Sequence, residues 1–121
     1  MTLRIRDAAP TDAEIIHGLI VELSEYEKLR DECYSDPATL VSHLFGERPY
    51  AEVRVAEWDG EVVAMALFFH TFSTFECAPS LYLEDLYVRV SHRGRGIGKA
   101  MLSELARIAV EIGRASCRER V

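Results

Sequence analysis

Cysteine is scarce in this sequence. The 121 residues include three cysteines, Cys33, Cys77 and Cys117, which are widely spaced and form no Cys-x-x-Cys pair. This pattern excludes a zinc ribbon and argues against a disulfide framework, so we expect a protein of a reducing compartment, the cytoplasm. The histidines show no metal-ligand spacing, and we expect no metal site.

Long apolar runs and excess positive charge are also missing. No apolar run approaches the roughly 18 residues of a membrane span, and the first residues, Met1–Arg4, do not resemble a signal peptide. The chain has 14 basic against 20 acidic residues, a net charge of −6. This balance argues against nucleic acid or an anionic membrane as a partner and is compatible with a cationic small molecule. At this length we expect one soluble domain.

Hydrophobic periodicity and turn signals predict the element order β-α-α-β-β-β-α. A first helix is expected over Asp12–Lys28, opened by a capping box of Thr11 and Glu14. A shorter helix begins at Asp36-Pro37 and stops at Gly46. A third helix follows the last strand. The strands are expected at Leu3–Arg6, Glu52–Trp58, Glu61–Thr71 and Leu81–Val90. We therefore predict an α/β (α+β) sandwich.

A glycine-rich segment links the last predicted strand to the third helix. It reads Arg93-Gly94-Arg95-Gly96-Ile97-Gly98-Lys99. Such a turn aims unpaired backbone N–H groups at one point, and the helix dipole favours negative charge there. Glycines permit positive φ and the close approach of a phosphate, and the basic side chains add charge. The segment therefore predicts a phosphate-binding loop.

The spacing within this loop distinguishes between known phosphate-binding patterns. The Walker pattern fails because Arg93 stands at its first glycine and Ala100 at its Ser/Thr, and the dinucleotide pattern fails because Lys99 replaces its third glycine. The pattern that fits is Arg-x-x-Gly-x-Gly, formed by Arg93, Gly96 and Gly98. It resembles the pyrophosphate loop of the GNAT N-acetyltransferases, which hold acetyl-coenzyme A in this way, and it implies the GNAT acyl-CoA N-acyltransferase fold.

Further segments resemble the diamine (spermidine/spermine-type) acetyltransferase branch of that family. They are Glu22-Leu23-x-x-Tyr26-Glu27, Phe45-Gly46 and Leu81-Tyr82-Leu83-Glu84-Asp85, and the matches run from Leu3 to about Glu111. The resemblance implies that Tyr26, Glu27 and Glu84 lie at the acceptor site, and it allows a homodimer of the full-length protein. It also implies that acetyl-CoA is held by Leu86, Tyr87, Val88, Arg93, Gly94, Arg95, Gly96, Ile97, Gly98 and Lys99.

The chemistry of amine acetylation favours a carboxylate at the acceptor site. An alkyl amine with a pKa near ~10 is mostly ammonium at neutral pH, so a carboxylate that attracts the cation and accepts its proton is needed. Glu84 is the candidate for this catalytic role. Strand alternation would place Glu84 and Asp85 on opposite faces. The alternative is that both are solvated charges at the end of a strand, and we interpret His92 as a surface turn residue.

The C-terminal segment departs from the family pattern. Nothing after Glu111 matches, and residues 112–121 resemble the translation of a sequencing-library adapter. We therefore expect residues 1–111 to be a partial GNAT domain and residues 112–121 to be a non-native tail. The resemblance places the general acid, a tyrosine, in a later helix. We expect the tail to fray or extend the third helix, and the 121-residue chain to be inactive and aggregation-prone.

The function predicted for the parent protein is direct transfer of the acetyl group of acetyl-CoA to a primary amine. The acceptor would be a small diamine, polyamine or amino-acid-like amine. Two alternatives stay open from the sequence: a CoA-binding module without catalysis, and a protein-modifying acetyltransferase.

Overall fold

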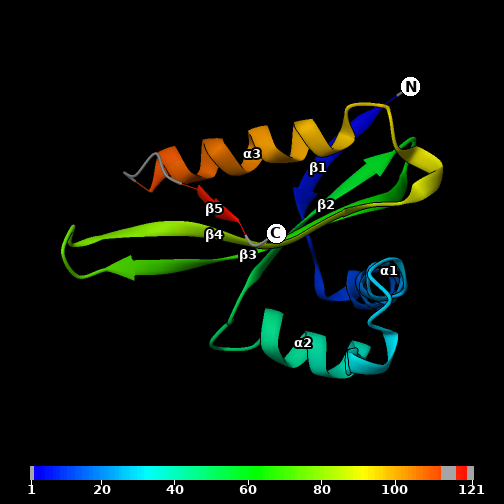
Figure 1. Cartoon of the computed structure of the whole chain (residues 1–121), viewed down its shortest axis with the longest axis horizontal. Coiled ribbons are helices and arrows are strands. Elements are labelled where there is room, and N and C mark those ends of the chain that lie inside the picture. The colour runs from blue at the N-terminus through cyan, green and yellow to red at the C-terminus, as the bar shows by residue number, and fades with distance from the viewer. Residues whose placement is uncertain (1, 113–116, 120–121) are drawn as a thin grey trace.

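The sheet at the centre of the molecule separates two helical layers. In the computed structural model, which describes residues 2–112 and the backbone of residues 117–119, five strands form one sheet in the order β1-β2-β3-β4-β5. Helices α1 and α2 cover one face and α3 covers the other (Figure 1). The predicted α+β fold is confirmed. The strands are β1 (Leu3–Asp7), β2 (Glu52–Trp58), β3 (Glu61–Ser73), β4 (Ala78–Val88) and β5 (Cys117–Glu119), and the helices are α1 (Ala13–Tyr26), α2 (Pro37–Phe45) and α3 (Ile97–Glu111).

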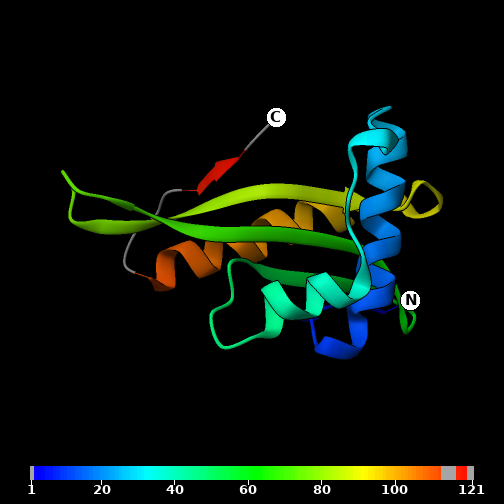
Figure 2. The ribbon, with the colours of Figure 1, turned by 90° about the horizontal axis from the view of Figure 1, so that it is seen from below.

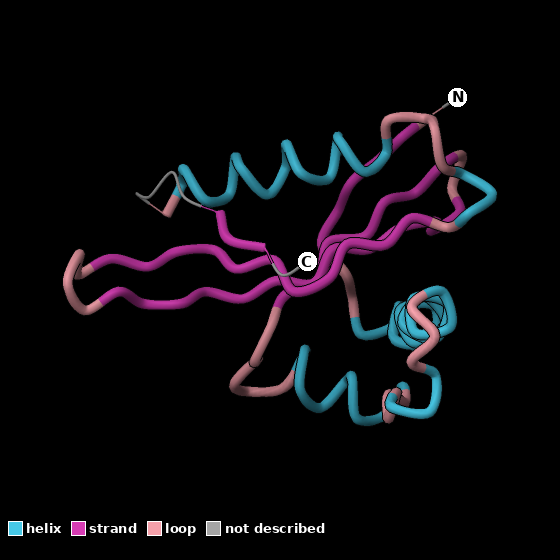
Figure 3. The backbone as a smooth tube through the Cα atoms, in the orientation of Figure 1, coloured by secondary structure: helices cyan, strands magenta, loops and turns pink. Residues whose placement is uncertain are grey.

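The strands from β1 to β4 pair antiparallel, each with the next strand along the chain. The Asp59-Gly60 turn connects β2 to β3, and both of its residues have positive φ, as a tight hairpin turn requires. The hairpin of β3 and β4 is longer than the helices that flank it and extends beyond them (Figure 2). The connection from β4 to α3 lies at the opposite end of the sheet (Figure 3). The candidate site lies at this second end.

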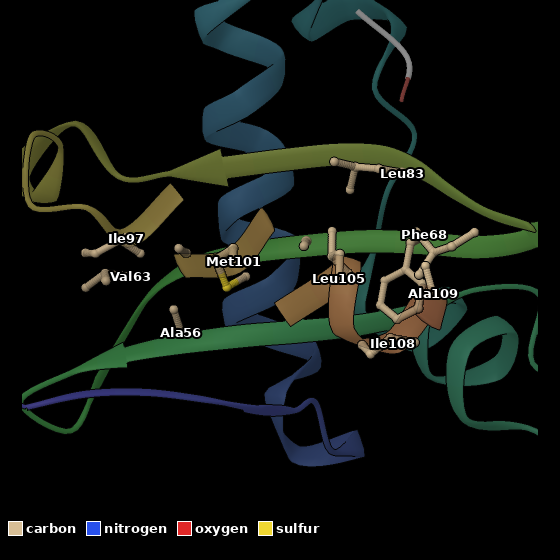
Figure 4. Packing of buried hydrophobic residues seen from close by; sticks show 12 residues of the cluster. Ala56, Val63, Phe68, Leu83, Ile97, Met101, Leu105, Ile108 and Ala109 are labelled. Atoms are coloured by element: carbon tan, nitrogen blue, oxygen red, sulfur yellow. The ribbon is translucent and has the colours of Figure 1, made fainter. Parts of the chain in front are cut away.

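Each face of the sheet has its own hydrophobic core. Under α3, the helix residues Met101, Leu105 and Ile108 pack on Phe68 and Leu83 (Figure 4). On the other face, Ile16 and Leu19 of α1 pack on Val55, Met65 and Tyr87. The spacing of these residues along α1 and α3 gives each helix one apolar face. The two cores hold the ends of α1 and α3 at fixed positions beside the end of β4.

The start of α1 differs from the prediction. The Thr11–Glu14 capping box is wrong, because α1 has no side-chain cap at its N-terminus and Pro10–Asp12 form a 3₁₀ turn instead. The Asp12 carboxylate accepts a hydrogen bond from the Ala9 N–H at 2.7 Å and binds the Arg6 guanidinium through both oxygens, at 2.8 and 3.0 Å. The helix α2 begins as predicted, with the Asp36 side chain accepting from the Thr39 N–H.

The expectation for the C-terminal segment is also wrong in one respect. Residues 117–119 neither fray nor extend α3: they form β5, which pairs in parallel with Leu81–Leu83 of β4. Backbone hydrogen bonding needs no particular side chain, so a segment without apolar periodicity can still add to an open strand edge. The residues 113–116, 120 and 121 lie outside the described part of the chain.

Among the described residues, no helix is long and apolar enough to cross a membrane.

Candidate functional site

A cleft of about 510 Å³ lies where the C-terminal end of α1, the end of β4 and the start of α3 meet. Figures 1 and 2 show these segments at the same end of the molecule. The cleft brings together most of the predicted acceptor and cofactor residues, which come from three separate parts of the sequence. Its lining is formed by Leu23, Tyr26, Glu27, Leu86, Tyr87, Val88, His92, Arg93, Gly94, Gly96, Ile97, Gly98 and Lys99.

The glycines of the loop shape the side of the cleft formed by α3. Gly94 has φ of 79° and Gly96, the residue before α3, has φ of 80°; both values are unfavourable for residues with a Cβ. The first helical hydrogen bond runs from the Ala100 N–H to the Gly96 carbonyl. The N–H groups of residues 97–99 therefore have no acceptor within the helix. Together with Arg93 and Lys99 they make this end of the cleft suited to an anion.

The edge of β4 forms the floor of the cleft. In an antiparallel pair, the N–H and C=O groups of alternate residues point to the same neighbour. Arg89 donates its N–H to Val63 of β3, so the backbone groups of Leu86 and Val88 point to the other side. On the side of β4 away from β3, β5 pairs only as far as Leu83. Within the described residues, no strand pairs with Leu86–Val88 on that side. The backbone groups of Leu86 and the N–H of Val88 are therefore open to the cleft, whereas the Val88 carbonyl accepts a hydrogen bond from Arg93.

Arg93 crosses the cleft from the loop toward α1. Its Nε donates to the Val88 carbonyl at 2.9 Å. Its guanidinium carbon lies 4.7 Å from the centre of the Tyr26 ring and 5.5 Å from that of the Tyr87 ring, within the range of a cation–π contact. One cation therefore links the predicted cofactor loop to the predicted acceptor residue Tyr26.

Arg95 is placed differently from what the sequence indicated. Arg95, predicted to bind the cofactor, is not part of the cleft lining among the described residues: its guanidinium lies 5.2 Å from the centre of the Trp58 ring. His92, predicted to be a surface turn residue, belongs to the 3₁₀ turn Val90–His92 and also lines the cleft. Its ring is edge-on to Trp58 at 6.5 Å. Trp58, the single tryptophan of the chain, thus contacts the loop from outside the cleft.

Glu84 lies at a β-bulge of β4. Leu67 and Phe68 of β3 are opposite Asp85 and Leu83, so Glu84 is an extra residue with no partner position in the ladder. Leu83 and Leu86 both pack under α3, so strict alternation breaks once between these two residues. The expected placement of Glu84 and Asp85 on opposite faces stays a prediction. Among the described residues, the cleft lining contains neither of them.

A polar cluster that the sequence pattern did not predict lies behind the cleft. Glu22 of α1 accepts a hydrogen bond from the Tyr87 hydroxyl at 3.2 Å and another from Arg89 Nε at 3.1 Å. Burial, together with the Glu22 charge, raises the pKa of Tyr87, so the phenol stays protonated at neutral pH and donates. The position of Glu22 one helical turn before Tyr26 was the available signal.

A second cleft, of about 570 Å³, lies beside the C-terminal end of α2 and contains none of the predicted site residues. Its charged groups already pair with one another: Arg54 contacts Asp7 at 2.8 Å and Glu52 at 3.6 Å. The smaller cleft at the end of β4 is therefore the better candidate for a site that binds a phosphate-containing ligand.

Comparison with known proteins supports the same assignment. The sequence profile of the Acetyltransferase (GNAT) family matches residues 19–120. Thialysine N-epsilon-acetyltransferase of Bos taurus is 38% identical over 117 residues, which is 90% of this chain and 68% of that protein. The human spermidine/spermine N(1)-acetyltransferase-like protein 1 is 32% identical over 114 residues, which is 88% of this chain and 16% of that protein.

The fold has close counterparts among solved structures. Ribosomal-protein-alanine N-acetyltransferase from Brucella melitensis superposes with a TM-score of 0.83 at 23% identity. The match covers 99% of this chain and 80% of that one. At this identity the likeness concerns the fold.

Proposed function

The chain belongs to the acetyltransferase (GNAT) family of acetyl-CoA-dependent N-acetyltransferases, and on that premise we propose that the cleft at the end of β4 binds acetyl-CoA and a small primary amine. The observation that carries the proposal is the meeting of the glycine-rich start of α3, the open edge of β4 and the end of α1 around one cleft.

The residues present suit a nucleotide thioester. The N–H groups of residues 97–99, with Arg93 and Lys99 beside them, provide donors and positive charge for a pyrophosphate. A Cβ on Gly94 or Gly96 would meet no atom within 4 Å, so these glycines serve the backbone conformation. The outward backbone groups of Leu86 and the N–H of Val88 offer hydrogen bonds to an amide-containing arm that runs along the strand.

The acceptor is proposed to enter between the end of α1 and the bulge of β4. Tyr26 supplies the ring face that Arg93 does not cover, and Glu27 supplies a carboxylate; both suit an alkylammonium ion. The names of two relatives, which refer to thialysine and to spermidine/spermine, support an acceptor of this size. We therefore propose an amino-acid-like amine, a diamine or a polyamine as the substrate class.

Glu84 is the proposed general base. It would accept the proton of the ammonium group, directly or through a water molecule, so that the neutral nitrogen can attack the thioester carbon. In this reaction one C–N bond forms and one C–S bond breaks, and the CoA thiolate leaves. Because a thiol has a pKa near ~8.5, the thiolate is a good leaving group.

The proposal is tested by binding of CoA to matched glycine variants. Gly96→Asp places a carboxylate at the start of α3, and Gly60→Asp makes the same change at a residue of similar φ, 87°, in the β2–β3 turn, which does not line the cleft among the described residues. We expect isothermal titration calorimetry to show lost CoA binding for the first variant and nearly unchanged binding for the second. Equal CoA affinity in both variants would show that the loop is not part of the CoA-binding site.

The substrate class is tested separately on the full-length parent protein, with acetyl-CoA and a panel of amines. We expect turnover of small diamines or lysine-like amino acids and none of a peptide whose only amine is its N-terminus. A preference for the peptide would favour the protein-modifying alternative. CoA binding without turnover of any amine would favour a binding module.

A further inference from the structure

Behind the cleft, one carboxylate of α1 holds two residues of β4. The Glu22 carboxylate accepts from the Tyr87 hydroxyl through one oxygen and from Arg89 Nε through the other. Tyr87 and Arg89 flank Val88 and lie on the face toward α1, while Val88 packs on the core under α3. Glu22 therefore spans the end of β4 from the side opposite α3.

The stretch of β4 that Glu22 holds is the open edge of the cleft. The backbone groups of Leu86 and Val88 point toward the cleft. The side chains of Tyr87 and Arg89 point toward α1, and their backbone groups face β3. Within the described residues no strand supports this edge. Its position therefore depends on β3 and on the side-chain contacts made by Tyr87 and Arg89.

The same cluster also reaches the loop. Tyr87 is 5% exposed, and its ring lies under the Arg93 guanidinium at 5.5 Å. Arg93 in turn donates to the Val88 carbonyl. A shift of the Tyr87 ring would therefore displace both the strand edge and the arginine of the loop. Arg89 adds a second anchor, because its guanidinium also lies 3.5 Å from Glu61 of β3.

We propose that Glu22 is a positioning residue of this site, which holds Tyr87 and Arg89 so that the β4 edge and Arg93 are aligned for acetyl-CoA. This inference rests on the proposed function. Glu22 does not line the cleft among the described residues, so its effect on the ligand passes through Tyr87 and Arg89. The predicted consequence is a change in CoA affinity without a loss of fold.

The test uses an isosteric variant of Glu22 and a matched control on the same helix. Glu22→Gln keeps the volume of the side chain and removes its charge, and Glu25→Gln makes the same change at an exposed position of α1. We expect Glu22→Gln to raise the Kd of CoA about 5-fold to 10-fold, since hydrogen bonds to a charged group are weakened at a partly exposed site. Glu25→Gln should leave the Kd within about 2-fold.

A double-mutant cycle identifies the path of the effect. Tyr87→Phe removes the hydroxyl and keeps the ring, and we expect it to raise the Kd in the same direction. The rise in Kd of the double variant should be smaller than the product of the two single rises, because both substitutions break the same interaction. If Glu22→Gln lowers the thermal stability, Tyr87→Phe still tests the hydroxyl bond with a smaller perturbation.

The outcomes separate this inference from the proposed function. If the unsubstituted chain does not bind CoA, the proposed function fails. If it binds CoA and Glu22→Gln, with an unchanged melting temperature, binds equally well, the positioning role is wrong and the proposed function stands. Independent, multiplying effects of Glu22→Gln and Tyr87→Phe would also overturn it.

Discussion

The guanidinium of Arg93 lies 4.7 Å from the centre of the Tyr26 ring, so the loop that opens α3 and the end of α1 touch across the cleft. Arg93 belongs to the proposed cofactor side and Tyr26 to the proposed acceptor side. The same guanidinium is tied to the end of β4 through the Val88 carbonyl. The two halves of the proposed site therefore share one arginine, and a change at Arg93 should affect both.

The first prediction concerns this arginine. Arg93→Lys keeps the positive charge but loses the planar group that contacts the tyrosines and the Val88 carbonyl, and we expect the Kd of CoA to rise about 3-fold to 10-fold. Arg93→Gln should weaken binding further. The measurement is calorimetric titration with CoA. Arg107→Lys and Arg107→Gln, on the exposed face of α3, are the controls, and equal effects at the two positions would contradict the prediction.

A second prediction separates the two carboxylates at the β4 bulge. In the full-length parent protein, Glu84→Gln should lower the turnover of amines about 100-fold, since it removes the proposed general base, and should leave the Kd of CoA nearly unchanged. Asp85→Asn is the matched control at the next position of β4, and we expect a smaller effect on turnover. The readouts are acetylation rates across pH and CoA titration. A rate and pH profile unaltered by Glu84→Gln would leave Glu84 as a strand-end charge.

Acid stability should depend on Asp12. The hydrogen bonds from Arg6, and then that from the Ala9 N–H, lower the pKa of this carboxyl. Because the pKa is lower in the folded chain than in the unfolded one, the stabilisation is present above the unfolded value and is lost as pH falls below about 4. We expect Asp12→Asn to destabilise the chain by about 1–2 kcal/mol at neutral pH and to flatten the loss of stability in acid.

Urea unfolding at several pH values measures this effect. Asp31→Asn, a change at an exposed aspartate of the α1–α2 connection, is the control. A parallel loss of stability in acid for Asp12→Asn and for the unsubstituted chain would contradict the role of Asp12.

The last prediction concerns β5. Because β5 pairs with Leu81–Leu83, ending the chain after Ile112 should leave that stretch of β4 open to pairing with another chain. We expect the shortened chain to scatter more light and to melt at a lower temperature than the 121-residue chain. Equal aggregation and melting of both would mean that the β4–β5 pairing contributes nothing to the fold. That the 121-residue chain itself is inactive and aggregation-prone stays a prediction.

Local patterns in the sequence predicted most elements of this fold. The Asp36-Pro37 start of α2 and the Asp59-Gly60 turn depend on residues that are neighbours in the chain, and the structure has both. The Arg-x-x-Gly-x-Gly spacing likewise predicted the loop, because positive φ at Gly94 and Gly96 and an open helix start are properties of that short segment. Such features need no knowledge of what packs against them.

Other features were decided by contacts between distant segments. The bulge at Glu84 comes from the register of β4 against β3, and strand alternation cannot reveal an extra residue. Arg95 turns to Trp58, and Glu22 binds Tyr87 and Arg89, because the sheet brings these residues together. Periodicity reports which face of an element is apolar, whereas the partner of each polar side chain depends on how the elements pack. The sequence by itself therefore determined the elements and the loop, and the tertiary structure decided which charges meet around them.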